Sequence, residues 1–282
     1  PVKNQSLLIV FFFSVFFQQL SAQDSLVKPE KYTAHNKGKF YVFWGGNRGY
    51  FTDSDIHFTG DDHDFTIYDV PSHDKPKGWH VDYISPGRMT IPQTNFRLGY
   101  FINDHYNISI GVDHMKYVMY QDRAVDINGS YPNEGSYGES LPNNQVFLTE
   151  EFLTFEHTDG LNYVNSEFSR VDDISSWFKL PNTDKVQINL TEGVGAGVLY
   201  PKSNVQMFGQ DRHDEFHIAG FGLDVKAGLN FTFFKYFFIQ TELKGGYINM
   251  NDIRTTGDSR DRASQDFWFM ETVIAFGGIF RI

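Results

Sequence analysis

The sequence feature that most constrains the fold is an alternation of apolar with small or polar residues, sustained over long segments. From Ala219 to Phe231, every odd position is apolar, and the even positions hold glycines together with Asp224, Lys226 and Asn230. A period of two places successive side chains on opposite faces of an extended strand. The segment is therefore predicted to be a β-strand with two unlike faces.

Seven further segments have strand character, four of them with the same clean alternation. The clean ones are Phe96–Ile102, Tyr106–Val112, Phe237–Tyr247 and Trp268–Phe280. The segments 40–52, 154–168 and 186–200 are less regular, and their facing is uncertain. In the last of them, Glu192 falls on the apolar face unless a β-bulge shifts the register.

The polar face of these segments indicates a crowded barrel interior, because it is rich in glycine and the chain contains 25 of them. Mean hydropathy is -0.39, which is too low for several membrane-spanning helices. A β-barrel tolerates that value, since only alternate strand residues face lipid and the loops are polar.

Short and long connections alternate along the chain. Tight turns are expected at 103–104 and 234–235, with a longer piece at 169–184. The long connections are 53–92, 121–153, 201–215 and 252–265. Such asymmetry is typical of outer-membrane barrels. We expect an all-β fold over residues 39–282, a closed antiparallel up-and-down transmembrane β-barrel of about eight strands, with short periplasmic turns and long extracellular loops.

The first segment has the pattern of an export signal. Leu7 to Phe17 is almost wholly apolar and too short to span a bilayer as a helix, and Ala22 offers a small residue for cleavage. Residues 1–22 are therefore predicted to be a signal peptide and residues 23–38 a periplasmic linker. The expected location of the mature chain is the outer membrane, reached through the periplasm.

Composition excludes several classes of function. The net charge of -11 argues against nucleic acid as a partner, because phosphates would not be neutralised. The absence of cysteine excludes disulfides and thiolate metal sites. No nucleophile-elbow, zincin or phosphate-loop motif is present. We therefore expect a non-enzymatic protein without a cofactor.

Charged residues on the inward face are predicted to form one polar layer in the middle of the barrel. They are Arg97, Asp113, Asp224, Lys226, Glu242, Lys244 and Glu271. Charges in a narrow lumen must pair, because an unpaired buried charge is costly. An eight-stranded barrel is just wide enough for side chains to fill it, so this layer is expected to plug the lumen. A conducting polar pore is the alternative.

The first long connection is rich in Asp and His. Asp61, Asp62, His63 and Asp64 are candidate ligands for a divalent cation, including one that bridges to lipopolysaccharide phosphates. A solvated acidic surface is the plainer interpretation. The alternation at 56–58 and at 65–68 predicts a hairpin that extends above the membrane.

Two further groups are candidates for a role at the membrane surface. Aromatic residues near the strand ends are expected to form interfacial girdles, namely Tyr100, Tyr106, Phe237, Tyr247 and Trp268. A lipid-modifying enzyme would instead need a Ser or His beside an acid at the outer rim. The candidates for that chemistry are Ser203, Asp211, His213, Asp214, Glu215 and His217.

The architecture resembles small outer-membrane barrels of the OmpA and OmpX type. The terminal segment Gly277–Ile282 is similar to the one read by the barrel-insertion machinery, although Phe280 is third from the end rather than last. The phenylalanine-rich signal and aromatic first strand resemble exported proteins of the Bacteroidota. The resemblance implies outer-membrane lipid, lipopolysaccharide and the insertion machinery as partners. The resemblance carries no diagnostic functional motif. We expect a structural, adhesive or envelope-maintenance role, with a lipid-modifying enzyme, a narrow porin or a subunit of a larger envelope complex as alternatives.

Overall fold

The computed structural model describes residues 35–76, 93–180 and 182–282 of the chain. The predicted signal peptide, residues 1–22, lies outside the described residues, as does most of the predicted linker, residues 23–38. Part of the first long connection, residues 77–92, also lies outside them.

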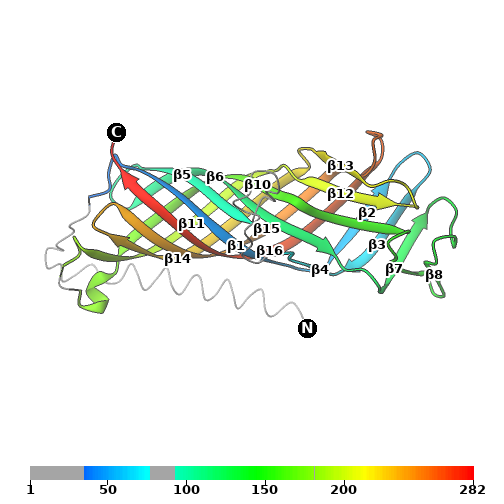
Figure 1. Cartoon of the computed structure of the whole chain (residues 1–282), viewed down its shortest axis with the longest axis horizontal. Helices are drawn as coiled ribbons and strands as arrows, with labels where there is room; N and C mark the ends of the chain where they lie inside the picture. Colours follow the sequence, from blue (N-terminus) through cyan, green and yellow to red (C-terminus); the bar gives the residue numbers. More distant parts are fainter. Residues whose placement is uncertain (1–34, 77–92, 181) are drawn as a thin grey trace, which may run out of the picture. The chain divides into compact units, whose positions relative to one another are not determined.

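The described part of the chain is built from β-strands, with one short 3₁₀ helix (Figure 1). The elements are β1 (Phe40–Phe51), β2 (Ser54–Thr59), β3 (Asp64–Val70), β4 (Ser72–His73), β5 (Thr94–Phe101), β6 (Tyr106–Met119), β7 (Ala124–Ser130), β8 (Ser140–Leu141), β9 (Gln145–Phe147), β10 (Leu153–Asp173), η2 (Ser175–Phe178), β11 (Val186–Leu199), β12 (Lys202–Met207), β13 (His213–Phe216), β14 (Gly220–Phe233), β15 (Phe237–Arg254) and β16 (Arg262–Phe280). Within these described ranges, no helix has the length and apolar character needed to cross a membrane.

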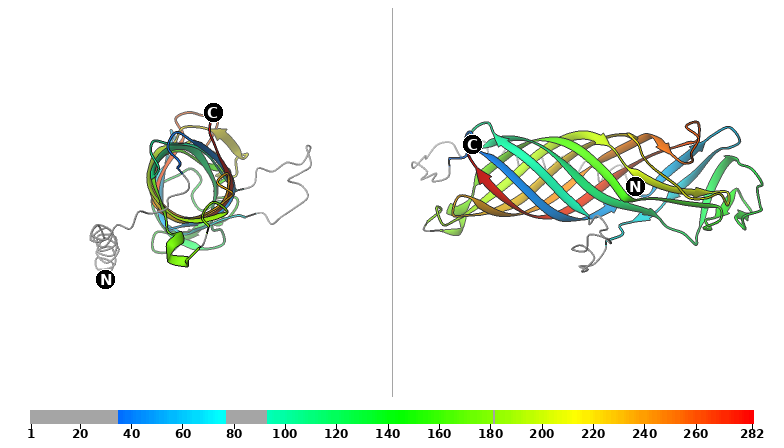
Figure 2. Two further views of the ribbon diagram at one scale, coloured as in Figure 1. Left: turned by 90° about the vertical axis from the view of Figure 1, so that its left-hand side faces the viewer. Right: turned by 45° about the horizontal axis from the view of Figure 1, so that its top comes forward.

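Eight of the strands follow one another around a ring, in the order β1-β5-β6-β10-β11-β14-β15-β16, and every pairing is antiparallel. The last strand returns to the first, because β16 pairs with β1 from Phe40–Phe280 to Phe51–Phe269. The ring is visible when the strands are viewed end-on (Figure 2, left). The sheet has 16 strands, where the sequence predicted about eight, because the long connections contain short strands of their own.

Two of the turns at one end of the ring form for identifiable local reasons. The side-chain oxygen of Asn103 accepts hydrogen bonds from the backbone N–H groups of His105 and Tyr106, at 2.9 and 2.8 Å. Phe234 and Lys235 both adopt positive φ, 52° and 69°, as the central residues of a tight hairpin require. Both turns lie where the sequence predicts them.

The two less regular strands of the second half have different explanations. In β10, a register shift between His157 and Leu161 places Asp159 in a bulge, where Gly160 has φ +134°. The bulge explains why Asp159 is exposed although it shares the parity of the inward residues, and the rest of the irregularity arises because the inward positions are apolar up to Tyr163 and polar from Asn165. In β11 the predicted alternative of a bulge is wrong, because the pairing with both neighbours is unbroken and Glu192 stays on the outward face, opposite Arg170.

The long connections build an ordered extension at the end of the ring opposite the C-terminus (Figure 1). The predicted hairpin is present as β2 and β3, which continue the sheet from β16 to β7. A second hairpin, β12–β13, pairs with the outer part of β10. The inward side chains of these two hairpins and their loops, such as Phe58, Phe65 and Phe208, share one apolar core with the part of the ring next to the extension.

Among the described residues, the ladder is interrupted where β5 begins at Thr94, because its neighbours β1 and β6 extend further toward the extension, and β4 pairs there with the last residues of β6. Polar side chains bridge the gap. Asp74 accepts a hydrogen bond from the backbone N–H of Gly49 (3.0 Å) and one from Gln93 (2.5 Å). The side chain of Asn47 donates to the carbonyl oxygen of His114 (3.2 Å). Backbone groups that have lost a strand partner are thus partly satisfied by side chains.

We expect Gly99→Ala to destabilise the ring. A Cβ at Gly99 would lie 2.1 Å from the ring of Tyr41, which is buried and whose hydroxyl donates to Asn107. Overpacking of this kind costs about 1–3 kcal/mol. Urea titration of vesicle-embedded protein, followed by tryptophan fluorescence, measures the change. The outward Gly46→Ala is the control, because its nearest neighbour is 3.6 Å away; an equal effect of the two substitutions would contradict the explanation.

Candidate functional site

The strand ring holds a layer of charged side chains on its inner face. The seven residues that the sequence singled out for this layer all point inward and are at most 7% exposed. They come from five strands: Arg97 from β5, Asp113 from β6, Asp224 and Lys226 from β14, Glu242 and Lys244 from β15, and Glu271 from β16. The alternation of the strands brings residues far apart in sequence to one level.

The centre of the layer is a residue that the sequence prediction did not include. Glu167 on β10 contacts three cations, Arg97 at 2.8 Å, Lys226 at 2.5 Å and Lys244 at 2.8 Å. It was missed because the inward positions of β10 are apolar at Leu161 and Tyr163 but polar from Asn165 on, so that neither face of the strand is consistently apolar. The local signal was present, since the outward-facing Phe168 directly follows Glu167 and implies that Glu167 faces inward.

Asp113 is a second point at which the charges converge. Its carboxylate lies 2.5 Å from Lys244 and 3.4 Å from Arg97, and accepts hydrogen bonds from Asn95 (2.7 Å) and Asn165 (2.8 Å). The two amide side chains thus supply hydrogen bonds to the Asp113 carboxylate in addition to its contacts with the cations. Buried charges are tolerated only with such dense pairing and hydrogen bonding.

The layer contains more acids than bases. Three cations face five carboxylates when Glu167 is included, and two of the carboxylates are held by neutral donors instead of cations. Asp224 accepts from the hydroxyl of Tyr163 (2.7 Å), and Glu271 accepts from the amide of Asn95 (3.0 Å). The carboxylates of the layer therefore differ in environment, which makes them separable by mutation.

The space on the two sides of the layer differs in character. Toward the turn end, a cavity of about 30 Å³ is lined mainly by polar side chains, including Asn107, Asn189 and Asn230. Toward the extension, the ring is filled by apolar side chains such as Tyr117, Ile248 and Phe267. The charged layer thus separates a small polar vestibule from a packed apolar core.

The outer face of the ring carries an apolar belt at the level of this layer. Outward side chains such as Ile110, Leu243 and Ile274 are 51–63% exposed. On β15 the belt runs from Phe237 to Tyr247, a ten-residue step. At about 3.3 Å per residue and a tilt of about 40°, that step spans about 25 Å, the height of the apolar band in outer-membrane barrels.

The predicted interfacial aromatics all lie on outward positions at the ends of the belt. Tyr100, Tyr106 and Phe237 are near the turn end, where the ring of Tyr106 stacks on Phe168 at 5.4 Å. Tyr247 and Trp268 lie opposite each other near the extension, with ring centroids 5.3 Å apart. Beyond them, Asn249 and Asp266 take the outward positions, so the belt ends at this aromatic pair.

The predicted metal ligands do not form one site. Asp61 pairs with Arg260, Asp62 with His63 (2.9 Å) and Asp64 with His57 (2.9 Å), so each carboxylate has its own partner. No group of three or more His, Asp or Glu side chains that could hold a metal ion occurs within residues 35–76, 93–180 and 182–282. The loop departs from the expected divalent cation site because its charges pair separately.

The candidate enzyme residues are also separated. Ser203 is buried and its Oγ lies 2.9 Å from Nδ1 of His157, far from solvent. The exposed rim residues pair elsewhere: His213 with Glu215 (3.4 Å), Asp214 with Lys202 (2.9 Å) and His217 with Asp252 (2.8 Å). Asp211 is exposed in the loop between β12 and β13. The Ser–His contact was not foreseen, because His157 lies 46 residues earlier in the chain.

Comparisons with known proteins find similar solved structures. No family model and no curated protein matches the sequence. Among solved structures, the chain is similar to Ail, the attachment invasion locus protein of Yersinia pestis, with 12% identity, a TM-score of 0.30, and coverage of 85% of this chain and 99% of that one. It is also similar to the outer membrane protein OprG of Pseudomonas aeruginosa, with 10% identity, a TM-score of 0.37, and coverage of 88% and 99%.

A third similar structure is the N-terminal β-barrel domain of Pseudomonas aeruginosa OprF, with 8% identity, a TM-score of 0.30, and coverage of 86% of this chain and 98% of that one. These three structures are outer-membrane proteins, as in the resemblance stated from the sequence, and nothing in them supports the expected Bacteroidota origin. At these TM-scores the likeness carries no argument about function.

Two Glu→Gln substitutions should separate the roles of the buried carboxylates. Glu167→Gln removes the charge that three cations share, and breaking a buried ion pair costs about 3–5 kcal/mol. Glu271→Gln, equally buried, removes a carboxylate that is held by Asn95, and we expect less than about 1 kcal/mol. Urea titrations in vesicles measure both, and equal losses of stability would contradict the assigned pairing.

A pH dependence follows from His157, which lies above the belt, beside the outward-facing Glu156 and Thr158. Burial lowers the pKa of His157 from its ordinary 6.5 to about 4. The unfolded chain therefore binds the proton first as the pH falls, and stability is lost between pH 6.5 and about 4, by at most about 3 kcal/mol. His157→Gln should flatten the stability profile measured by urea titration over this range, and an unchanged profile would contradict the explanation.

Proposed function

We propose that the protein is an integral outer-membrane β-barrel whose lumen is plugged by its own side chains. In this proposal the eight-strand ring is the closed transmembrane barrel, the tight turns face the periplasm and the extension stands outside the cell. The outward belt and the pairing of β1 with β16 support it, since hydrocarbon tolerates strands only when every backbone group has a partner.

The single observation that carries the plugged lumen is the ion-pair network around Glu167. Arg97, Lys226 and Lys244 reach it from three strands and cross the interior at the level of the belt. All four side chains are at most 3% exposed, and the apolar core above them fills the rest of the lumen. A narrow porin would need a continuous polar path at this level, which these contacts occupy.

The long connections favour a surface role over a purely internal one. Instead of separate loops, they fold into one extension with a shared core that includes Phe65, Tyr131 and Phe208. A structure with an ordered core presents a defined outer surface, as a structural or adhesive envelope protein requires. Lipopolysaccharide around the belt, and the insertion machinery at Gly277–Ile282, remain the partners that we propose.

The lipid-modifying enzyme is the less favoured alternative. The buried Ser203 and His157 form a contact without an acidic third member, since Nε2 of His157 has no hydrogen-bond partner among the described residues. Nucleophilic catalysis at a membrane surface needs an accessible nucleophile and an oriented base. The observed pair serves better as a polar contact inside the apolar core.

The plugged barrel can be tested with Lys244→Met, which leaves Asp113 and Glu167 short of one cation. Removing one partner of a buried pair should lower stability by about 3–5 kcal/mol. We expect planar-bilayer recordings to show no large steady conductance in either the unmodified protein or the variant, because the neighbouring side chains still fill the lumen. A large ohmic channel in the unmodified protein would refute the plug, and failure to enter vesicles would refute the barrel itself.

A further inference from the structure

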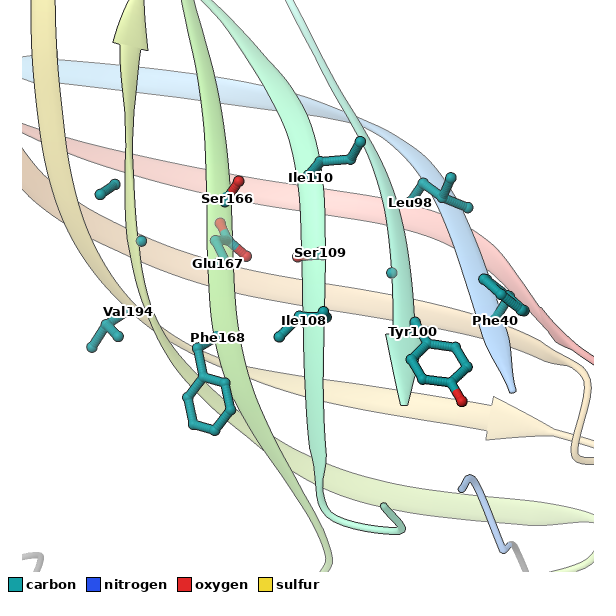
Figure 3. A pocket seen from close by; sticks show the side chains of 13 residues that line it. Phe40, Leu98, Tyr100, Ile108, Ser109, Ile110, Ser166, Glu167, Phe168 and Val194 are labelled. Carbon is teal, nitrogen blue, oxygen red and sulfur yellow. The ribbon is translucent and has the colours of Figure 1, made fainter. Parts of the chain in front are cut away.

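A groove of about 660 Å³ crosses the outward face of five neighbouring strands, β1, β5, β6, β10 and β11 (Figure 3). Its outward lining is apolar apart from one serine and comes from two cross-strand rows. The row nearer the turn end is Phe40, Tyr100, Ile108, Phe168 and Val194. The next row contributes Leu98, Ile110, Ser166 and Ala196.

The groove exists because the second row contains two small side chains. Ser166 and Ala196 are cross-strand neighbours on β10 and β11. The rows on either side of them carry larger residues on the same two strands, Phe168 with Val194 and Val164 with Val198. The small pair therefore leaves a depression in a face that is otherwise filled by exposed apolar side chains. A flexible hydrocarbon chain fits a depression of this kind.

Charged residues lie immediately next to the groove, one row closer to the turns. Arg170 follows the row of Phe168, and its cross-strand neighbours are Tyr106 and Glu192. Its guanidinium lies 5.8 Å from the centroid of the Tyr106 ring and 2.5 Å from Asp172. The side chain of Arg170 is 45% exposed. The groove thus continues into a row that contains Arg170 and Glu192, and Asp172 follows in the row after it.

An apolar groove that adjoins side chains of both charges suits an amphiphilic ligand, with a hydrocarbon chain and a charged head group. A lipid phosphate would pair with Arg170, whose guanidinium geometry suits phosphate oxygens. Two carboxylates, Glu192 in the same row and Asp172 in the next, where it also contacts His105 (3.0 Å), face the one guanidinium. This excess of carboxylates disfavours a purely anionic head group and favours one that also carries an ammonium. The turn end faces the periplasm in the proposed orientation, so the lipid would come from the inner leaflet.

We propose that this face binds phosphatidylethanolamine, with one acyl chain in the groove beside Ser166 and Ala196 and the head group at Arg170, Asp172 and Glu192. The inference rests on the proposed function for the orientation of the barrel. The phosphate meets the guanidinium and the ammonium meets the carboxylates. The site would anchor a specific phospholipid to the inner-leaflet side of the barrel.

Native mass spectrometry of the detergent-purified protein tests the proposal, with phosphatidylethanolamine and phosphatidylglycerol of matched acyl chains added in equal amounts. We expect a preference for phosphatidylethanolamine of about threefold, the size of one exposed ion pair. Glu192→Gln should abolish the preference, and Arg170→Gln should lower retention of both lipids.

The groove itself is tested by Ser166→Phe, which fills the depression and should lower retention of phosphatidylethanolamine at least about threefold. Thr272→Phe is the matched control, because Thr272 is exposed on the outward face of β16, four strands from Ser166 on β10, and does not line the groove. Ala196→Phe gives a second variant if the first folds poorly, as judged by mobility on unheated gels.

Equal retention of the two lipids by the unmodified protein, or unchanged retention in both groove variants, would overturn the lipid site. A dimer that disappears in Ser166→Phe would also overturn it, since the occupant would then be a second copy of the chain. Flotation with vesicles separates these results from a failure of the proposed function. Protein that inserts without lipid preference refutes the site alone, whereas protein that does not insert refutes the orientation on which the site depends.

Discussion

The hydrogen-bonded return of β16 to β1 is the constraint on which the rest of the structure depends. With twelve cross-strand partners between Phe40–Phe280 and Phe51–Phe269, the first and last strands of the ring have no free edge toward each other. Once the ring is closed, each strand has one face inside and one outside, and the side-chain alternation decides what each environment contains. The charged layer, the outer belt and the groove all follow from that division.

The polarity of the inward and outward side chains changes along the axis of the ring. At the level of the belt, apolar side chains such as Ile274 face outward, while Glu271 and its neighbours face inward. Beyond Trp268 the order reverses, because Asp266 faces outward and Phe267 inward. The same strands thus have a polar interior and an apolar outer face at the level of the belt, and an apolar interior and a polar outer face in the extension. In the proposed membrane, this reversal lies where hydrocarbon gives way to water.

The strand pattern and most of the inward layer were predictable because alternation is a local property. The clean segments placed Arg97, Asp113, Lys226 and Lys244 on the inner face, as the structure has them. Glu167 was not predictable with the same ease, since the inward positions of β10 change from apolar at Tyr163 to polar at Asn165, and the sequence does not show where this change falls. Apart from the predicted hairpin β2–β3, the strands in the long connections were missed because they are short and some pair with segments distant in sequence.

By itself, the sequence determined that the chain would form two-faced strands of a certain length, joined by short turns at one end and long connections at the other. Periodicity and turn chemistry depend on residues close together in the chain, so they can be recognised in the sequence alone. Only the tertiary structure decided which charges meet, that Glu167 joins three cations, that Asp61 and Asp62 pair separately, and that Ser166 and Ala196 adjoin in a groove. Those contacts depend on the register between strands, which closure of the ring sets.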